Sequence, residues 1–320
     1  MLKSYVYHDS DLLRATPFSI EQIERSRVKL PTSFKHTDDP NEADFFWIPI
    51  DLGHWEAYHG GVKNIRSGLP RLPYWNGNEA RHVAYFCSDG ADPVGLPLIM
   101  FRQSFYKDNK DVNAVAWPYA VEDFGDLVTD DFGKLPYDVS FVGSRVSSKS
   151  RIESFDSVAR EPRLRSFLDD SKLHWGKVEY TPVGEFRKEL FKQSLAESKM
   201  VLCARGGGLS CYRFFEAMSA GRVPVLFADD WELPHSHVID WDKCIIQIEE
   251  RDAKDTGKIL LSGLRGNNSD KELSWMGRYA RHVWEKYLAP ATWPDVMEMI
   301  LSVKLWELAG HITSDGFMKG

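Results

Sequence analysis

The stretch that decides the fold is Met200–Leu233, MVLCARGGGLSCYRFFEAMSAGRVPVLFADDWEL. Its pattern predicts a strand over 200–204, a glycine-rich turn, a helix near 210–220 that Gly221 ends, and a strand over 223–228. Strand, helix and strand in this order form the unit of a parallel α/β sheet. Glycines at the turn leave backbone N–H groups pointing at one spot, where the helix dipole favours negative charge. The turn is therefore a predicted phosphate site.

Two arginines and a glutamate accompany this turn. Arg205 and Arg213 can each give forked, charge-assisted hydrogen bonds to a pyrophosphate. Glu216 follows Arg213 by three residues, so both share one helix face, and its carboxylate can accept both hydroxyls of a ribose. Two plainer alternatives stay open: a flexible turn, and a solvated Arg–Glu pair. Neither a P-loop nor a GxGxxG pattern is present, which disfavours kinase-type and nicotinamide chemistry.

The rest of the chain alternates in the same way. Further strands are expected over 4–7, 43–50, 82–87, 113–117 and 137–143, and helices over 20–29, 95–106, 149–159 and 184–198. Residues 125–136, GDLVTDDFGKLP, combine turn formers and acids without periodicity, which indicates a linker. We expect one domain over 1–130 and a second over 131–290, with a helix within 291–320 that can pack back on the first.

Composition limits the classes of function. The 320 residues carry 40 basic and 47 acidic side chains. The net charge of −7 disfavours a protein that binds mainly by attraction to the phosphate backbone of a nucleic acid. The four cysteines form no CxxC pair, so neither a disulfide framework nor a zinc knuckle is expected. No signal peptide is visible, and no apolar run approaches the ~18 residues of a membrane helix. We expect a cytoplasmic protein, with peripheral attachment at the inner membrane face as an open alternative.

Residues 203–241, CARGGGLSCYRFFEAMSAGRVPVLFADDWELPHSHVIDW, resemble the signature region of the exostosin family of inverting glycosyltransferases. The features in common are the arginine–glycine turn, the Arg-Phe-x-Glu-Ala helix, the x-Val-Pro-Val strand and the Trp-Glu-Leu-Pro loop. Weaker matches are KSYVYHDS, ADFFWIPI, RHVAYFCSD and DVSFVGS, while His235 stands where the family usually has Phe. The resemblance implies an α/β protein of the GT-B fold. In that fold two Rossmann-like domains face each other across a cleft, with the nucleotide sugar in the C-terminal domain and the acceptor facing the N-terminal one.

The resemblance also implies roles in binding the donor. The diphosphate would be held by Arg205, Gly206, Gly207, Gly208 and Arg213, and the ribose by Glu216. Gly143, at the end of an earlier strand, is also expected to contact the donor. Asp229, Asp230 and Glu232 follow the strand over 223–228, where the hydroxyls of the donor sugar are expected. For each of these three, a turn with a capping acid is the alternative.

An inverting transfer needs a general base for the acceptor hydroxyl and cationic groups for the departing diphosphate. We expect the base in the loops that follow the N-terminal strands. Asp89 is the first choice, Asp51 the second and His54 the third, and for either acid an ordinary turn position is the alternative. Trp55, Tyr58 and Trp75 are expected to stack on acceptor sugar rings, although a core position is the alternative for any such aromatic side chain.

The sequence predicts an enzyme without metal or other cofactor. No His, Cys or Asp-x-Asp spacing forms a recognised metal site, and two arginines can neutralise a diphosphate. We expect a UDP-sugar as donor and an oligosaccharide or glycolipid as acceptor, in the synthesis of a surface polysaccharide or glycolipid. A noncatalytic nucleotide- or sugar-binding module of the same fold is the alternative. A phosphosugar epimerase or phosphorylase would need other loop chemistry or a cofactor lysine, neither of which the sequence identifies.

Overall fold

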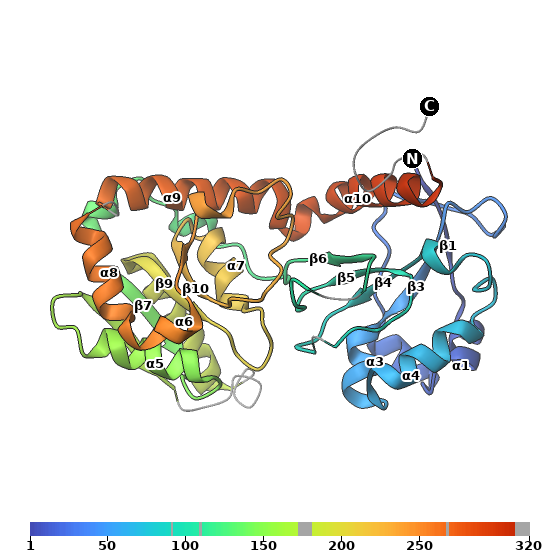
Figure 1. Ribbon diagram of the computed structural model, residues 1–320, viewed down its shortest axis with the longest axis horizontal. Helices are drawn as coiled ribbons and strands as arrows, with labels where there is room; N and C mark the ends of the chain where they lie inside the picture. Colours follow the sequence, from blue (N-terminus) through green and yellow to red (C-terminus); the bar gives the residue numbers. More distant parts are fainter. Residues whose placement is uncertain (91, 109–110, 172–180, 267–268, 311–320) are drawn as a thin grey trace. The chain divides into compact units, whose positions relative to one another are not determined.

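The computed structural model describes residues 1–90, 92–108, 111–171, 181–266 and 269–310. Two compact units are present, each built around its own parallel sheet (Figure 1). Unit 1 comprises Met1–Pro118, Glu232–Pro234 and the chain from Ala291 onward, and unit 2 comprises Tyr119–Trp231 and His235–Pro290. The predicted α/β fold class with two Rossmann-like units is therefore confirmed.

The sheet of unit 1 has the strand order β2-β1-β3-β4-β5-β6, and its paired strands run parallel. Its strands are β1 (Lys3–Val6), β2 (Lys35–His36), β3 (Phe45–Asp51), β4 (His82–Phe86), β5 (Ile99–Arg102) and β6 (Ala114–Ala116). In β4 and β5 every residue is buried, as in strands that are covered on both faces. The predicted strands over 43–50 and 82–87 therefore form the centre of this sheet.

Helices cover both faces of this sheet. On one face lie α1 (Asp9–Ala15), α2 (Ile20–Arg25), α3 (Leu52–Tyr58) and α4 (Gly61–Gly68), and on the other lies α10 (Trp293–Leu308). Figure 1 labels α1, α3, α4 and α10. Successive strand residues point to opposite faces, so Phe46 packs with Trp55 of α3, whereas Trp47 packs with Leu301 of α10. Residues 311–320, the rest of the segment expected to contain this helix, lie outside the described residues.

The sheet of unit 2 has the order β11-β10-β9-β7-β8, again with parallel pairs. Its strands are β7 (Tyr137–Gly143), β8 (Ser166–Asp170), β9 (Ser198–Ala204), β10 (Val223–Phe227) and β11 (Ile246–Gln247). The main helices are α5 (Lys149–Ala159), α6 (Pro182–Glu197), α7 (Tyr212–Ser219), α8 (Thr256–Arg265) and α9 (Asp270–Val283). Because β7 and β9 are neighbours in the same direction, the loops after Gly143 and Ala204 lie at one edge of the sheet.

The predicted helix over 95–106 is wrong. Its middle is the buried strand β5, and the chain before it is irregular: Gly95 has a φ of 69°, a left-handed conformation that a helix does not contain. The edge strands β2, β8 and β11 were not predicted. Two-residue strands have no period to detect, and all five residues of β8 are half-buried, so they show no alternation.

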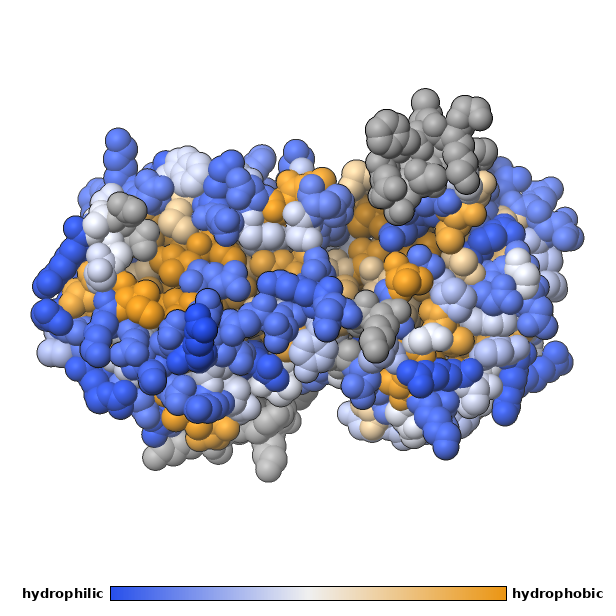
Figure 2. Space-filling model, in the orientation of Figure 1, coloured by the Kyte–Doolittle hydropathy of each residue, from blue (hydrophilic) through white to orange (hydrophobic). Residues whose placement is uncertain are grey.

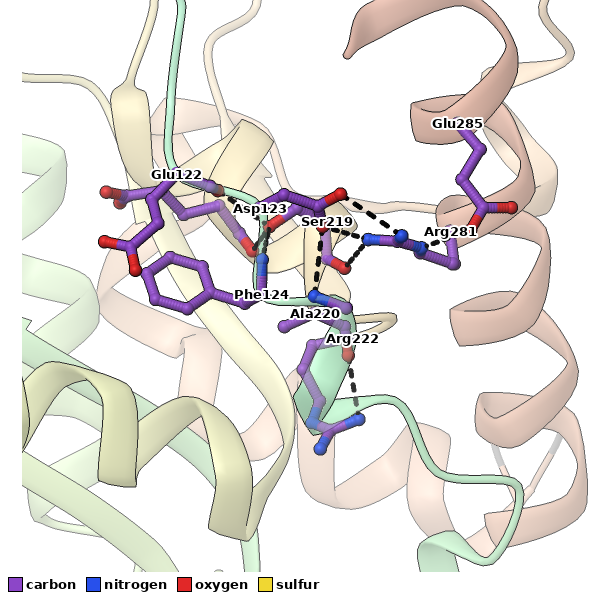
Figure 3. Close-up of polar contacts among 10 residues, drawn as sticks. Glu122, Asp123, Phe124, Ser219, Ala220, Arg222, Arg281 and Glu285 are labelled. Atoms are coloured by element: carbon purple, nitrogen blue, oxygen red, sulfur yellow. Dashed lines mark hydrogen bonds and ion pairs between the residues drawn. The ribbon is translucent and has the colours of Figure 1, made fainter. Parts of the chain in front are cut away.

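The chain after Pro118 packs with unit 2, although the sequence places the boundary near residue 130. The hydroxyl of Ser219, at the end of α7, accepts a hydrogen bond from the Phe124 N–H at 3.2 Å (Figure 3). Arg281 of α9 pairs with Asp123 and donates to the carbonyl oxygen of Ser219 at 2.6 Å. The buried Arg222 donates to the carbonyl oxygen of Leu127 at 2.7 Å. These contacts join residues 123–127 to residues 95 or more positions later in the chain. The composition of residues 125–136 could not show this packing, so the boundary was placed too late.

The surface is mostly hydrophilic on the face that Figure 2 shows. Among the described residues, no helix is both long and apolar enough to span a membrane.

Candidate functional site

The glycine-rich turn joins β9 to α7 in unit 2. β9 ends at Ala204, and α7 begins at Tyr212 after the N-cap residue Cys211, whose side chain makes no capping hydrogen bond. Arg205 and Gly206 are half-buried and Gly207 is exposed, so the turn is open to a ligand. Gly208 is buried. The helix start, which has no side-chain cap, thus follows a turn with one exposed glycine, an arrangement suited to an anion.

Arg213 reaches from the first turn of α7 to the end of β7. Its Nη2 donates to the carbonyl oxygen of Val142 at 2.9 Å, and its guanidinium lies over the Phe141 ring at 4.4 Å. Its Nε is buried and has no hydrogen-bond partner among the residues that the structure describes. Gly143 follows with a φ of 145°, and a Cβ at this position would lie 2.7 Å from Arg213 Nη2. The space for the guanidinium therefore depends on glycine at 143.

A third arginine at this edge, Arg151, was missed from the sequence. It lies in the first turn of α5 and donates to the carbonyl oxygen of Ala204 at 2.8 Å and to that of Ser144 at 3.2 Å. A Cβ on Gly206 would lie 3.5 Å from Arg151 Nη2, so the guanidinium adjoins the glycine turn. One signal in the sequence could have found it: Arg151 lies at the start of a predicted helix that follows a predicted strand. The glycine turn likewise lies between a strand and a helix.

Arg205 directly follows β9. Its Nε lies 3.8 Å from Glu250 Oε1, and its carbonyl oxygen accepts a hydrogen bond from the Ser148 hydroxyl at 2.7 Å. Glu250 was also missed from the sequence. With Arg151 and Arg213, Arg205 brings a third guanidinium to the carboxyl ends of β7 and β9. Three arginines around one glycine turn give an electropositive site of the kind that binds a diphosphate.

Glu216 lies one helical turn after Arg213 on α7. Burial raises the pKa of its carboxyl to about 7, with Arg213 opposing the rise and Glu122 adding to it. The residue is half-buried, so its carboxylate is partly desolvated but still open to the hydroxyls of a ligand.

The three acids after β10 differ from one another. Both carboxylate oxygens of Asp229 accept the Glu250 N–H at 3.1 Å, so this side chain caps the short helix that begins there, the alternative that the sequence left open. Asp230 is exposed. Glu232 belongs to unit 1, where its N–H donates to the carbonyl oxygen of Phe105 at 3.2 Å. Glu232 is thus part of unit 1, whereas the arginines are part of unit 2.

In unit 1, Asp51 connects the ends of two neighbouring strands. Its Oδ1 accepts the N–H of Gly53, as the N-cap of α3, and the N–H of Cys87 after β4, both at 2.8 Å. Burial raises the pKa of Asp51 to about 6, although these backbone hydrogen bonds act in the opposite direction. Asp89, two residues after Cys87, is exposed. Both carboxylates lie at the carboxyl edge of the sheet, where ligands bind in parallel α/β folds.

The other predicted residues of unit 1 divide into exposed and buried ones. The half-buried His54 ring lies 4.8 Å from that of Tyr58, and burial and His59 lower the pKa of His54. Tyr58 is 72% exposed and can contact a ligand. Trp55 and Trp75 are only 0% and 4% exposed and belong to the core, so the prediction that they stack on acceptor sugars is wrong. Trp55 lies on the face of α3 that points to the sheet, which the spacing alone did not show.

No group of three or more His, Cys, Asp or Glu side chains that could hold a metal ion occurs within the described parts of the chain.

The chain is similar in sequence to proteins of one known family. The Exostosin GT47 domain family matches residues 155–262, from within α5 to within α8. The Exostosin-1 homolog of Caenorhabditis elegans is 35% identical over 285 residues, which are 79% of this chain and 72% of that protein. Exostosin-1 of Drosophila melanogaster is 26% identical over 282 residues, 77% of this chain but only 36% of the fly protein. A crystal structure of Anabaena HepE in complex with UDP and glucose aligns with 94% of this chain and 99% of its own, at 9% identity and a TM-score of 0.46.

Proposed function

Since the chain belongs to the exostosin family, we propose that it is a glycosyltransferase that moves a sugar from a nucleoside diphosphate donor to a hydroxyl of a glycan acceptor. The observation that carries the proposal is the arginine cluster around the glycine turn of unit 2, in which Arg213 and Arg151 donate to the carbonyl oxygens of Val142 in β7 and Ala204 in β9. UDP is the proposed nucleotide, and the acceptor is an oligosaccharide or a glycolipid of a surface polysaccharide pathway.

The donor would bind through charge and hydrogen bonds. In this proposal Arg205, Arg213 and Arg151 hold the diphosphate together with the N–H groups of the glycine turn. Glu216 accepts the ribose hydroxyls with its half-buried carboxylate. Asp230 remains available to the donor sugar, since it is exposed and follows β10 directly.

The transfer proceeds with inversion in one displacement. The acceptor oxygen forms a bond to the anomeric carbon while the bond from that carbon to the diphosphate oxygen breaks, and the acceptor proton passes to a carboxylate. We propose Asp89 as this base, because it is exposed at the end of a central strand. Asp51 is the second choice, since its pKa of about 6 lies near neutrality but its Oδ1 already accepts two backbone N–H groups. The arginines stabilise the leaving diphosphate, so the step needs no metal ion.

A donor screen tests the proposal. Purified protein is incubated with UDP- and GDP-sugars and a panel of glycan acceptors, and the released nucleoside diphosphate is measured with and without EDTA. We expect release with one donor class, unchanged by EDTA. Binding of UDP without release or transfer for any pair would favour the noncatalytic module, and absence of any thermal shift with nucleoside diphosphates would reject both.

Asp89→Asn and Asp51→Asn then identify the base. The base variant should lower kcat by about 10²- to 10⁴-fold, the usual contribution of general base catalysis, and leave UDP affinity unchanged because both residues belong to unit 1. An undiminished rate in both variants would reject both carboxylates.

A further inference from the structure

A buried ion pair in unit 1 holds the loop that contains Asp89. Arg102, the last residue of β5, is 0% exposed, and its Nη1 lies 2.9 Å from Asp111 Oδ2. The same guanidinium donates to the carbonyl oxygen of Gly90 at 3.0 Å and to that of Asp92 at 3.1 Å. Gly90 directly follows Asp89 in the sequence. Arg102 therefore fixes the backbone next to the proposed base.

Asp111 extends this hold along the loop. Its carboxylate accepts the N–H of Val94 at 2.8 Å and the N–H of Gly95 at 2.7 Å, besides its pair with Arg102. Burying an ion pair costs free energy unless its remaining donors and acceptors also form hydrogen bonds. Here the additional hydrogen bonds of Arg102 and Asp111 are made with the backbone of one loop. The planar fork of Arg102 lies over the Phe86 ring at 4.2 Å, which sets its orientation.

Two hydroxyls restrain the same loop from its other end. The Ser88 hydroxyl donates to Glu56 at 2.6 Å and accepts the Gly90 N–H at 2.9 Å. The Ser104 hydroxyl donates to the carbonyl oxygen of Asp89 at 3.5 Å. The backbone around Asp89 is thus bonded on both sides, while the residue itself is exposed. A rigid backbone under an exposed carboxylate is what a preorganised proton acceptor requires.

We propose that Arg102, together with Asp111, is a positioning residue that holds Asp89 in place for proton transfer. The inference rests on the proposed function, in which Asp89 is the base. Arg102 does not reach the substrate in this assignment, since its side chain is completely buried. It acts through the carbonyl groups of Gly90 and Asp92.

Arg102→Lys tests the proposal, because a single ammonium keeps the charge opposite Asp111 but not the fork that reaches both carbonyls. We expect kcat to fall by about 10- to 100-fold, as small misplacements of a reacting group do, with KM for the donor and the Kd for UDP unchanged. In an Asp89→Asn background the same substitution should lower kcat by less than about 2-fold, because residues that act as one unit are not additive. A purely structural role would lower the rate equally in both backgrounds and overturn the proposal.

Two further variants keep the test decisive. Arg222→Lys is the matched control: Arg222 is a buried arginine of unit 2 that also donates to carbonyl oxygens, and its loss should lower Tm but not kcat. If Arg102→Lys does not fold, Ser88→Ala can be used instead, because it removes the hydrogen bond that the Ser88 hydroxyl accepts from the Gly90 N–H. Its kcat should fall when Asp89 is present and change by less than about 2-fold in the Asp89→Asn background. An unchanged kcat in the folded variant overturns the proposal. An active Asp89→Asn enzyme overturns the base and the positioning role together, whereas release of UDP still decides whether the protein is a transferase.

Discussion

At the residue scale, the ionised carboxylate of Glu216 lowers the stability of the fold but is expected to strengthen nucleotide binding. Burial raises its pKa to about 7 from the ordinary 4.5, so the folded state favours the protonated acid. The contribution of this group to stability is therefore present at low pH and is lost as the pH rises through about 7. At pH 8 the folded protein keeps a charged carboxylate that costs stability, which is typical of groups retained for a ligand.

Glu216→Gln should consequently stabilise the protein while it weakens nucleotide binding. At pH 8 we expect the free energy of unfolding to rise by on the order of 1 kcal/mol, with a smaller gain toward pH 5. The UDP affinity of the wild type should increase as the pH rises through about 7, because the ionised carboxylate is the better acceptor for ribose hydroxyls, and should fall about 10-fold in the variant. Urea unfolding and calorimetric titration measure both, with the exposed Glu307→Gln as control. Unchanged UDP affinity would remove Glu216 from the site.

Residue contacts within one element were predictable, and those between distant elements were not. Arg213 and Glu216 were placed on one helix face because a spacing of three is a local property. Arg151 reaches the glycine turn through a bond to Ala204, 53 residues away, and no local pattern carries that contact. Trp55 and Tyr58 both lie on α3, yet only the packing of the whole unit decides that one is buried and the other 72% exposed.

At the scale of elements, the end of β7 and the start of α7 depend on a single glycine. Gly143→Ala would place a Cβ 2.7 Å from Arg213 Nη2 and impose a φ of 145° on alanine. We expect a loss of about 1–3 kcal/mol of stability and, because Arg213 must leave Val142, a UDP affinity lowered by about 10-fold. Gly77→Ala is the control, since its φ of 84° gives a similar strain but a Cβ there meets nothing within 4 Å. Equal UDP affinities for the two variants would contradict the role of Arg213.

Asp51 is a second junction of elements, between the start of α3 and the end of β4. Asp51→Ala removes both accepted hydrogen bonds and should cost about 1–2 kcal/mol, as the loss of an N-cap does. Asp51→Asn keeps an acceptor oxygen and removes the charge, so at pH 7 it should be at least as stable as the wild type, whose raised pKa of about 6 marks a charge that folding disfavours. Thermal unfolding at pH 5 and 7 checks both, and an asparagine variant as unstable as the alanine one would contradict this account.

Most strands that are buried on both faces could be found from the sequence. Strands such as β4 and β9 consist of buried residues and are visible as apolar runs. β5 is also buried but ends in Arg102, whose charge is compensated by Asp111, a contact that the sequence does not show. The apolar run of β5, with a glycine before it and a charged residue at its end, was therefore predicted as part of a helix instead of a strand.

At the scale of the whole molecule, the chain does not divide at one point. Residues 291–310 return to unit 1, and α10 covers the face of its sheet that α1 to α4 leave open. The apolar spacing of this segment predicted a helix, but only the matching apolar face of β3 and β5 shows which surface it covers. The core of unit 1 thus includes α10, although this helix is far in the sequence from the strands that it covers.

Leu301→Ala tests this dependence. Leu301 is 0% exposed and packs with Trp47 and Phe101, so its truncation should leave a cavity and lower the free energy of unfolding by about 3 kcal/mol. Met299, on the same helix but 47% exposed, is the matched control, and Met299→Ala should cost less than about 0.5 kcal/mol. UDP binding should persist in both variants because the proposed donor residues belong to unit 2. Calorimetry with and without UDP measures these effects, and equal stabilities of the two variants would show that α10 is not part of the core of unit 1.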